Sequence, residues 1–562
     1  MPVINFSYSD LCELVGREVP RNVLREKLPM IGADMKVLDD SGDELSFEFF
    51  PDRPDLYSVE GIARSLRAFL GYEPGLRSYA VGGSDVDLNV DPSVRDVRPY
   101  IWSALVEGNE ITDALIRSMM DLQEKLHLTL GRNRRKVAIG IHDFRTVRPP
   151  FTYKAVDPDE ISFMPLQGSR RMTPAEILRE HEKGMAYAFV LEGKKKYPMI
   201  VDSAGEVLSF PPIINGIATA ITESTRDIFV DCTGTDINAV TCAVNILVTA
   251  LAERGGKVST VRIHQDGKTN LAPDLSPRKM TLDPNYVNGW IGTSLSAKDM
   301  GECLRRMGYG TEASGDKLEV LVPRYRSDII HEVDLAEDVA IGYGYDRFGG
   351  VLPQRATLGI GDDLKSFSNA IKPILIGLGY FEVVTLSLSN PRDQYKAMNL
   401  DVDRTAIHVK NPVSEEHVLL RTSLLPSLMT VLRKNKHREL PQRLFEVGDV
   451  VWNAKNRTLI SGVSIHAKAS FTEAKSVAQS MLSGIGLPQD IRPGGSPSFI
   501  DGRCATIHLE NDRVGVFGEV SPMTIEAFEL KYPVMAFELD LERVFELRQK
   551  GSSRSGDCIP KL

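Results

Sequence analysis

The chain has 562 residues and a formal net charge of −9, from 67 basic and 76 acidic side chains. This acidic balance argues against a generally basic surface for nucleic acid, so any RNA contact must come from local patches or from a partner chain. The length suggests about four domains, and contents of 42% apolar and 25% charged residues are typical of a globular protein with a large core.

The six cysteines are scattered and include no Cys-x-x-Cys pair, which argues against a disulfide framework or a zinc site. This usage favours a reducing cytosol. The first residues do not have the pattern of a secretory signal peptide, and no apolar run reaches the ~20 residues of a membrane-spanning helix. Together these features predict a cytoplasmic protein.

Residues 1–85 are predicted to form a small N-terminal αβ domain. Two short helices precede a strand over 45–50, whose side chains alternate between apolar and polar. A helix follows over 59–69, because Ser58 can cap it. The turn before this helix, Asp52-Arg53-Pro54-Asp55-Leu56, is interpreted as a structural turn held by an ion pair. A stretch rich in Gly, Asp and Ser then predicts a linker.

Residues 93–265 are predicted to form one α+β domain. A long amphipathic helix covers 111–130 and ends in a basic run, which could meet RNA phosphates but is more often a solvated loop. The capping box Thr173-Pro174-Ala175-Glu176 starts a second helix. A hairpin is expected around Ser203-Ala204-Gly205, and Asp236 caps a third helix that has an apolar stripe.

This domain carries the candidate catalytic residues. Four polar residues lie at predicted strand ends or in the loops that follow them: Ser209, Asn215, Asp231 and Thr233. One interpretation is a hydrolytic site formed where the strands converge, with Gly216 and Gly234 allowing close approach of the backbone. The other interpretation is that these side chains only satisfy backbone groups of their loops. No Ser-His-Asp grouping can be read from the sequence.

Residues 275–350 are predicted to form a small αβ domain with an acidic cluster. The cluster comprises Asp328, Asp334, Glu337 and Asp338. The last three stand at i, i+3 and i+4 and share one face of a predicted helix, and the first lies one short loop upstream. A hard divalent cation would offset their repulsion; the alternative is a solvated first turn favoured by the helix dipole. Arg324 and Arg326 could pair with these acids or contact RNA.

Residues 355–562 are predicted to form an antiparallel sheet with helices. An amphipathic helix covers 363–378 and a strand covers 381–388. No GxxxxGK[ST] loop for nucleotide phosphates is present. The polar tail from Gln549 is predicted to be disordered.

Five separated motifs, in order along nearly the whole chain, resemble the β subunit of phenylalanine–tRNA synthetase of the archaeal and eukaryotic-cytosolic type. The motifs are Asp52-Arg53-Pro54-Asp55-Leu56, Phe229-Val230-Asp231-Cys232-Thr233-Gly234, Asp334-Leu335-x-Glu337-Asp338-Val339-Ala340, Lys410-Asn411-Pro412-Val413-Ser414-Glu415 and Val516-Phe517-Gly518-Glu519-Val520. The family usually has Glu at the position of Asp338, so direct ligation by this residue is the least secure of the four.

The resemblance implies an α+β multidomain fold. Its parts are an N-terminal αβ domain over 1–85, an editing α+β domain over 93–265, a small αβ domain with the metal cluster over 275–350, and a class II synthetase-like antiparallel sheet domain over 355–562. The last is expected to be catalytically silent, because the arginines that would hold the ATP phosphates and adenine are missing, as after Gly518-Glu519-Val520.

The resemblance also implies a function. The family is a subunit of the ligase that joins L-phenylalanine to tRNA(Phe) with ATP, in an α2β2 heterotetramer whose α subunit uses the ATP. It assigns hydrolysis of mischarged tyrosyl-tRNA(Phe) to Ser209, Asn215, Asp231 and Thr233, and Mg²⁺ binding to Asp328, Asp334, Glu337 and Asp338. The alternative is a non-editing scaffold subunit that binds α and tRNA. A free-standing metal hydrolase would need an open metal position and a water-activating base, and neither is visible.

Overall fold

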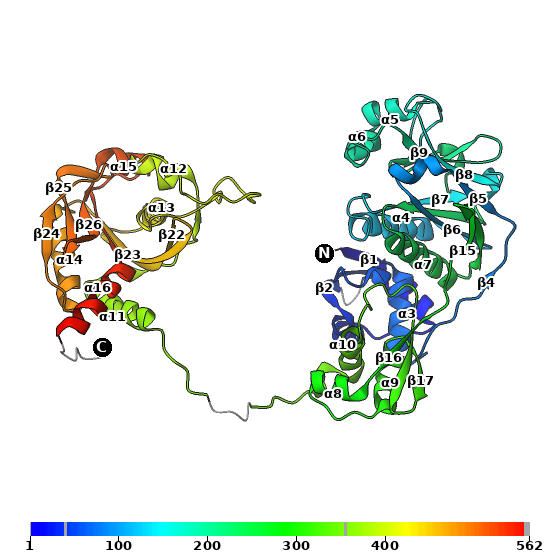
Figure 1. Cartoon of the computed structure of the whole chain (residues 1–562), viewed down its shortest axis with the longest axis horizontal. Helices are drawn as coiled ribbons and strands as arrows, with labels where there is room; N and C mark the ends of the chain where they lie inside the picture. Colours follow the sequence, from blue (N-terminus) through cyan, green and yellow to red (C-terminus); the bar gives the residue numbers. More distant parts are fainter. Residues whose placement is uncertain (1, 39–41, 353–356, 556–562) are drawn as a thin grey trace. The chain divides into compact units, whose positions relative to one another are not determined.

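The structure, a computed structural model, describes residues 2–38, 42–352 and 357–555, and the side chains of 2–36, 42–352 and 357–550. The chain divides into two compact units, Met1–Leu352 and Pro353–Leu562 (Figure 1). Both contain helices and strands, so the chain has a mixed α/β multidomain fold. Among the helices of the described residues, none is long and apolar enough to cross a membrane.

The first unit begins with a three-stranded antiparallel sheet in the order β1-β3-β2. Its elements are β1 (Val3–Ser7), α1 (Tyr8–Val15), α2 (Arg21–Lys27), β2 (Ala33–Leu38), β3 (Glu44–Phe49) and α3 (Val59–Phe69). The predicted cap of α3 is confirmed, since the Ser58 hydroxyl accepts a hydrogen bond from the Gly61 amide at 3.3 Å. The predicted ion pair in the preceding turn is also confirmed, with Arg53 donating to Asp55 at 2.8 Å.

The middle of the first unit contains two sheets, which build the site described below. One has the order β4-β13-β6-β12-β7 and the other β11-β10-β9-β8-β5-β14-β15. Their strands are β4 (Val81–Gly82), β5 (Asp87–Val90), β6 (Tyr100–Glu107), β7 (Val137–Asp143), β8 (Phe151–Val156), β9 (Tyr197–Val201), β10 (Val207–Phe210), β11 (Ile214–Asn215), β12 (Ile228–Gly234), β13 (Lys257–Ser259), β14 (Val261–Gln265) and β15 (Lys268–Ala272).

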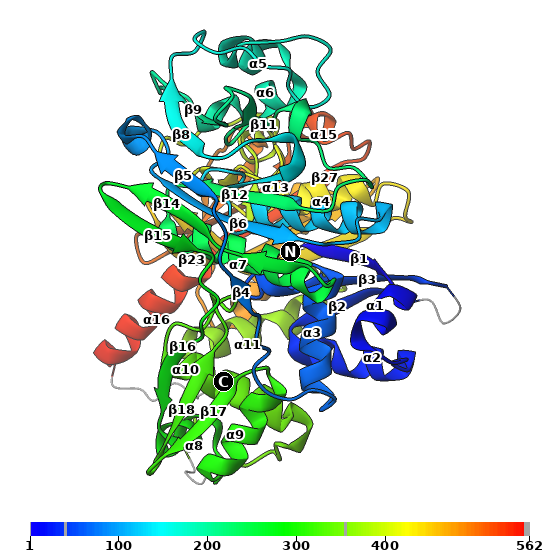
Figure 2. The same ribbon diagram turned by 90° about the vertical axis from the view of Figure 1, so that its right-hand side faces the viewer.

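Four helices belong to these sheets: α4 (Asp113–Leu128), α5 (Pro174–Glu180), α6 (Glu182–Tyr187) and α7 (Ile237–Glu253). α7 lies against β6 and β12 (Figure 2). It begins where the sequence predicts, because the Asp236 carboxylate accepts from the amides of Asn238 (3.0 Å) and Ala239 (3.2 Å). α4 begins two residues later than predicted, after its cap Thr112. The capping box that starts α5 is present, and β9 and β10 form the predicted hairpin.

The last part of the first unit is a small antiparallel sheet, in the order β16-β18-β17, with three helices. Its elements are β16 (Arg278–Leu282), α8 (Pro284–Ile291), α9 (Ala297–Arg306), β17 (Gly310–Ser314), β18 (Lys317–Val322) and α10 (Glu332–Tyr343). One hydrophobic core includes Phe47 of the N-terminal sheet, Leu247 of α7 and Leu335 of α10. This core therefore fixes the three parts of the first unit against one another.

The second unit is built on a seven-stranded sheet in the order β19-β22-β23-β27-β26-β25-β24, antiparallel except for β19. Its strands are β19 (Phe381–Glu382), β20 (Leu388–Ser389), β21 (Leu419–Leu420), β22 (Gln442–Trp452), β23 (Lys455–Ile465), β24 (Asp490–Pro493), β25 (Phe499–Leu509), β26 (Asp512–Val520) and β27 (Val534–Asp540). β20 and β21 pair separately. The strand predicted over 381–388 is therefore wrong, since only its two ends are strand.

Six helices accompany this sheet: α11 (Asp363–Gly377), α12 (Pro391–Gln394), α13 (Leu425–Lys434), α14 (Phe471–Gly484), α15 (Pro522–Ala527) and α16 (Leu541–Ser555). Both faces of the sheet are covered, because alternate residues of β27 enter different cores: Met535 and Phe537 pack with α11, α14 and α16, whereas Ala536 packs with α13. α16 continues past Gln549, where disorder was predicted, and residues 556–562 lie outside the described part.

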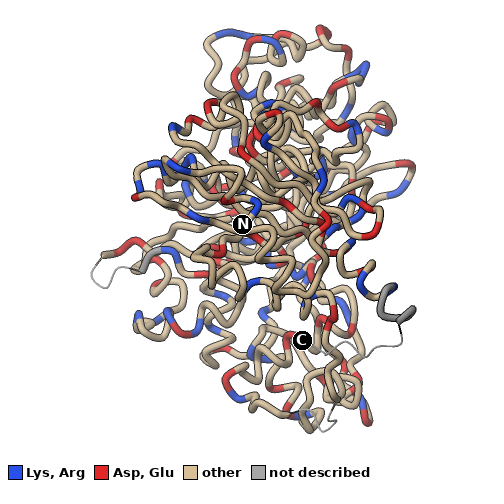
Figure 3. The backbone as a smooth tube through the Cα atoms, turned by 90° about the vertical axis from the view of Figure 1, so that its left-hand side faces the viewer, with Lys and Arg blue, Asp and Glu red and all other residues tan. Residues whose placement is uncertain are grey.

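Basic and acidic residues are interspersed along the chain rather than gathered into regions of one sign (Figure 3). The formal net charge of the chain is −9. The charged groups considered in the following subsections are mostly buried.

Candidate functional site

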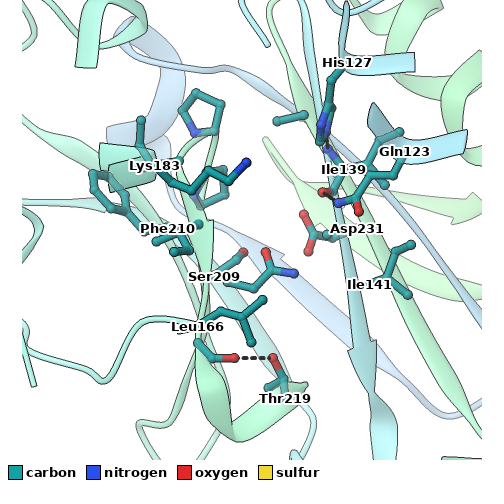
Figure 4. A pocket seen from close by; sticks show the side chains of 18 of the residues that line it. Gln123, His127, Ile139, Ile141, Leu166, Lys183, Ser209, Phe210, Thr219 and Asp231 are labelled. Atoms are coloured by element: carbon teal, nitrogen blue, oxygen red, sulfur yellow. Dashed lines mark hydrogen bonds between the residues drawn. The ribbon is translucent and has the colours of Figure 1, made fainter. Parts of the chain in front are cut away.

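A cavity of about 310 Å³ opens between the two middle sheets of the first unit (Figure 4). Its lining comes from α4, β7 and β12 on one side and from residues 209–216 on the other. Lys183 of α6 also lines it. Ser209 and Asp231 lie on facing walls, and the lining also includes apolar residues such as Leu166 and Ile214. A small number of polar groups among apolar side chains is typical of a small-molecule site.

Three of the four predicted catalytic residues line this cavity. Ser209 of β10 and Asn215 of β11 stand directly opposite each other in the strand register, and Asp231 comes from the middle of β12. The structure thus brings together residues from separate strands, as the sequence predicts.

Thr233 is placed differently from the other three. Its hydroxyl accepts from Nε of Arg98 at 2.9 Å, and its carbonyl oxygen accepts from Nη2 of the same arginine at 2.7 Å. Arg98 is almost completely buried, and burial lowers its pKa to about 10. Thr233 therefore satisfies a buried guanidinium beside the site and is not among the residues that line the cavity.

The Asp231 carboxylate is fixed by a histidine that the sequence analysis does not single out. Nε2 of His142, from β7, donates to Oδ2 of Asp231 at 2.7 Å, and Nδ1 lies 2.8 Å from the Thr219 hydroxyl. All three side chains are buried. The arrangement orients the carboxylate at the base of the cavity.

Gly140 makes room for this pair. It stands opposite Asp231 in the register of β7 and β12. A Cβ at this position would lie 2.2 Å from Oδ2 of Asp231 and 2.6 Å from Nε2 of His142. Any side chain here would displace the carboxylate or the imidazole. The glycine is therefore required for the pairing of Asp231 with His142, and not for the geometry of the strand.

Two buried polar atoms at the cavity have no hydrogen-bond partner among the described residues: Oγ of Ser209 and Nε of Arg134. The other nitrogens of Arg134 are used, since Nη2 donates to Glu124 at 2.7 Å and Nη1 donates to the carbonyl of Ile213 at 2.9 Å. Buried polar atoms are nearly always paired in folded proteins. An unpaired polar group beside a cavity is a candidate partner for a bound ligand or an ordered water.

A second histidine of the cavity wall is held neutral. Nε2 of His127 accepts from the Ile139 amide at 2.9 Å, so its proton is on Nδ1, toward Glu124. Burial, with the nearby Arg134, lowers the pKa of His127 to about 4. Glu124 and Arg134 form an ion pair at 2.7 Å, and hydrogen bonding to His127 with the Arg134 charge lowers the pKa of Glu124 to about 2.

The low pKa of His127 predicts a loss of stability in mild acid. The unfolded chain takes up a proton at this imidazole below about pH 6.5, whereas the folded chain does so only near pH 4. The contribution of His127 to the free energy of unfolding is therefore complete above about pH 6.5 and is lost as the pH falls toward 4. We expect the free energy of unfolding to fall by about 3 kcal/mol between pH 7.5 and pH 4 from this group. Urea unfolding between pH 7.5 and 4 measures it, and His127→Gln, which can still accept from Ile139, should unfold with a shallower pH dependence. Equal pH dependence in both proteins would contradict this assignment.

The predicted metal ligands are found with protein partners. Arg326 donates through Nε to Asp328 at 2.9 Å and through Nη2 to Asp338 at 2.7 Å, and the Tyr309 hydroxyl also donates to Asp338. Asp334 accepts from the backbone amides of Ile330 and His331, each at 2.7 Å.

Glu337 is the remaining member of the acidic cluster. Partial burial and the neighbouring carboxylates, Asp338 first among them, raise its pKa. The described residues contain no group of three or more His, Cys, Asp or Glu placed to hold a metal ion. As placed here, the donor set does not fit Mg²⁺, because a guanidinium already neutralises two of the acids and backbone amides occupy a third. Metal binding by this cluster stays a prediction.

The comparisons with known proteins cover nearly all of the chain. A B3/4 domain model matches residues 108–261, a tRNA synthetase B5 domain model matches 280–345, and the model for the phenylalanyl tRNA synthetase beta chain CLM domain matches 351–541. The cavity lies within the first of these matches and the acidic cluster within the second. Domains of this kind, in this order, define a subunit of an aminoacyl-tRNA synthetase.

Full-length relatives identify the subunit. The phenylalanine–tRNA ligase beta subunit of Archaeoglobus fulgidus is 47% identical over 97% of this chain and 99% of its own length. That of Methanothrix thermoacetophila is 45% identical over 96% of this chain and 100% of its own length. A solved N-terminal fragment of the beta subunit from Pyrococcus horikoshii is 39% identical, with a TM-score of 0.59, and covers 61% of this chain. The chain belongs to the family of phenylalanine–tRNA ligase β subunits.

Proposed function

We propose that the cavity between β10, β7 and β12 hydrolyses tyrosyl-tRNA(Phe), the product of mischarging. The observation that carries the proposal is the cavity of about 310 Å³ with the fixed Asp231 carboxylate at its base and the unpaired Ser209 hydroxyl in its wall. Hydrolysis of this ester by the α–β complex, compared with that of phenylalanyl-tRNA(Phe), tests it.

Selection for tyrosine follows from the phenol hydroxyl. An apolar pocket built for phenylalanine cannot strongly reject an analogue that only adds a hydroxyl, so a second hydrolytic site is useful. In the cavity the phenol would donate to the Asp231 carboxylate, whose other partner is His142. Phenylalanine would displace water from these groups without replacing its hydrogen bonds, which disfavours it by ~1–3 kcal/mol.

The remaining polar groups serve to hold the ester. Ser209 and Asn215 sit across one strand pair and can bond the amino acid or the terminal ribose, and Arg134 offers its free Nε. No protein nucleophile is required, because hydroxyls of the tRNA itself can orient the attacking water. In this assignment Thr233 acts indirectly, by holding Arg98 beside the site.

The rest of the chain is assigned to assembly. We propose that it joins an α subunit in an α2β2 tetramer, and that α uses ATP to join phenylalanine to tRNA(Phe). The proposed domains are the parts over 1–85, 93–265, 275–350 and 355–562, of which the first three share one hydrophobic core. The second candidate function is a scaffold subunit that binds α and tRNA without editing. The unpaired hydroxyl of Ser209 in the cavity wall favours editing.

We predict that the purified chain alone forms no aminoacyl-adenylate. Strand β26 ends at Val520, and Ser521 then caps α15, so no arginine follows Gly518-Glu519-Val520 to lie beneath an adenine. Phenylalanine-dependent exchange of pyrophosphate into ATP measures adenylate formation, with the α–β complex as the positive control. Robust exchange by the lone chain would refute the assignment of the second unit as catalytically silent.

A further inference from the structure

A second cavity, of about 350 Å³, lies in the first unit away from the proposed editing site. It is lined by α3, the loop over 73–78, the residues that follow α9 and the segment Tyr325-Arg326. Five arginines line it, against two acids, Asp55 and Glu73; the arginines are Arg53, Arg64, Arg67, Arg77 and Arg326. The excess of guanidinium groups in the lining makes the cavity attractive to anions.

Four of these arginines are more than nine-tenths buried: Arg53, Arg64, Arg67 and Arg326. Burying a guanidinium is unfavourable unless its charge and its N–H groups are matched. Arg53 is matched by Asp55, and Arg326 by Asp328 and Asp338. Arg67 is matched by the buried carboxylate of Glu253, which also pairs with Arg77. Asp328, Asp338 and Glu253 are not among the residues that line the cavity.

Arg64 is the group without a carboxylate. Its guanidinium stacks on the Tyr325 ring at 3.8 Å, and Nη1 donates to the Tyr79 hydroxyl at 3.3 Å. Among the described residues, no carboxylate forms a salt bridge with it. Its remaining N–H groups are therefore free of acidic partners while they face a cavity lined with further arginines.

Arg326 supplies the second, independent observation. Its Nη1 is buried and has no hydrogen-bond partner among the described residues. The electrostatics agree: although burial raises the pKa of Asp55, Arg53 and then Arg326 and Arg64 hold it below its usual value. The Asp55 carboxylate is thus stabilised by three guanidinium groups. Two of them, those of Arg64 and Arg326, still have N–H groups without a hydrogen-bond partner in the described part of the chain.

We propose that this cavity binds a small oxyanion of the phosphate class, inorganic phosphate or pyrophosphate, between Arg64 and Arg326. Several oxygens on one multivalent centre match the forked N–H groups of arginine, which accounts for arginine at every basic position of the lining. The anion would complete the charge balance of Arg64 and accept from Nη1 of Arg326. This cavity shares no lining residue with the proposed editing cavity. Failure of the anion-binding experiment would therefore leave the proposed editing function untouched, and the reverse also holds.

Isothermal titration of the full chain with pyrophosphate and with phosphate, at constant ionic strength in a phosphate-free buffer, tests the proposal. We expect saturable binding of at least one anion by the wild type. Arg64→Gln should weaken binding at least 10-fold, which corresponds to about 1.4 kcal/mol. Arg17→Gln is the matched control, because Arg17 also stacks on a tyrosine, Tyr72 at 4.2 Å, but is exposed and does not line the cavity.

Thermal melts establish whether Arg64→Gln is folded. If it is not, Arg77→Gln decides, since this side chain lines the cavity but is 47% exposed, and it should weaken binding several-fold. No saturable binding by the wild type, or unchanged binding in a folded variant of the lining, would overturn the proposal. A short RNA oligonucleotide forms the last arm: Arg64-dependent binding of RNA without binding of either free anion would overturn the free-anion assignment in favour of a backbone phosphate.

Discussion

Asp231→Ala in the α–β complex should slow hydrolysis of tyrosyl-tRNA(Phe) by roughly 10- to 100-fold while leaving phenylalanine charging unchanged. The change removes the acceptor for the phenol and leaves the imidazole of His142 without its partner at 2.7 Å. Asn215→Ala should act in the same direction, because Asn215 lines the same cavity opposite Ser209. Deacylation of purified tyrosyl-tRNA(Phe), followed beside an aminoacylation assay, measures both effects.

Asp113→Ala is the matched control for this experiment. Asp113 lies in the same domain at the start of α4, but its side chain is 61% exposed and pairs with the exposed Arg117. It should hydrolyse the tyrosyl ester at the wild-type rate. If Asp231→Ala and Asn215→Ala keep that rate as well, the cavity is not the editing site and the scaffold function remains.

Arg326→Met should lower the free energy of unfolding by about 3–5 kcal/mol, the cost of leaving buried carboxylates without their cation. Asp328 and Asp338 both lose this partner, and both are largely buried, with side-chain exposures of 13% and 6%. Arg324→Met is the control: this neighbour is 42% exposed and pairs with Asp274 near the surface, so its loss should change stability by about 0–1 kcal/mol. Urea unfolding of the three proteins gives the comparison.

The same proteins separate an ion-paired cluster from a metal site. A metal that binds only the folded chain stabilises it by mass action, so its removal lowers the melting temperature. An ion-paired cluster without a metal predicts that a chelator leaves the melting temperature of the wild type unchanged. A clear decrease with chelator, reversed by Mg²⁺, would show that the acids hold a metal and that the pairing with Arg326 is replaced when it binds.

Local signals in the sequence predicted much of the fold correctly. Asp236 before an apolar stripe placed the start of α7, and the capping box at Thr173 placed the start of α5, because the hydrogen bonds of a cap lie within a few residues. The strand predicted over 381–388 is wrong, because the apolar residues in its middle do not lie within a sheet. Val384 and Leu386 are 85% and 67% exposed, so their apolar character does not reflect a place within a sheet.

The candidate site was predictable only in part. Ser209, Asn215 and Asp231 could be proposed as a group from their predicted places at strand ends, and the structure brings them to one cavity, although β12 continues past Asp231 to Gly234. The pairing of His142 with Asp231 could not, since it depends on the register between β7 and β12, which lie far apart in sequence. Thr233 lies two residues after Asp231 on β12 and was proposed for the same site. Its hydroxyl instead accepts a hydrogen bond from Arg98, which is distant in sequence.

Arg326 shows the same limit in the acidic cluster. The spacing of Asp334, Glu337 and Asp338 predicted a shared helix face, and α10 confirms the helix. Pairing of Arg326 with the acids was one of two expectations, and it is confirmed at Asp328 and Asp338. Whether such a cluster recruits a metal or a guanidinium depends on which partner the tertiary structure brings close, and residue spacing alone does not decide this.

The rate at which the wild-type α–β complex hydrolyses tyrosyl-tRNA(Phe), divided by its rate with phenylalanyl-tRNA(Phe), tests the central claim most directly. A single hydrogen bond from the phenol to the fixed Asp231 carboxylate predicts a ratio of roughly 5 to 150 in favour of the tyrosyl ester. A ratio near one, with both esters hydrolysed slowly, would contradict the claim that this cavity selects tyrosine.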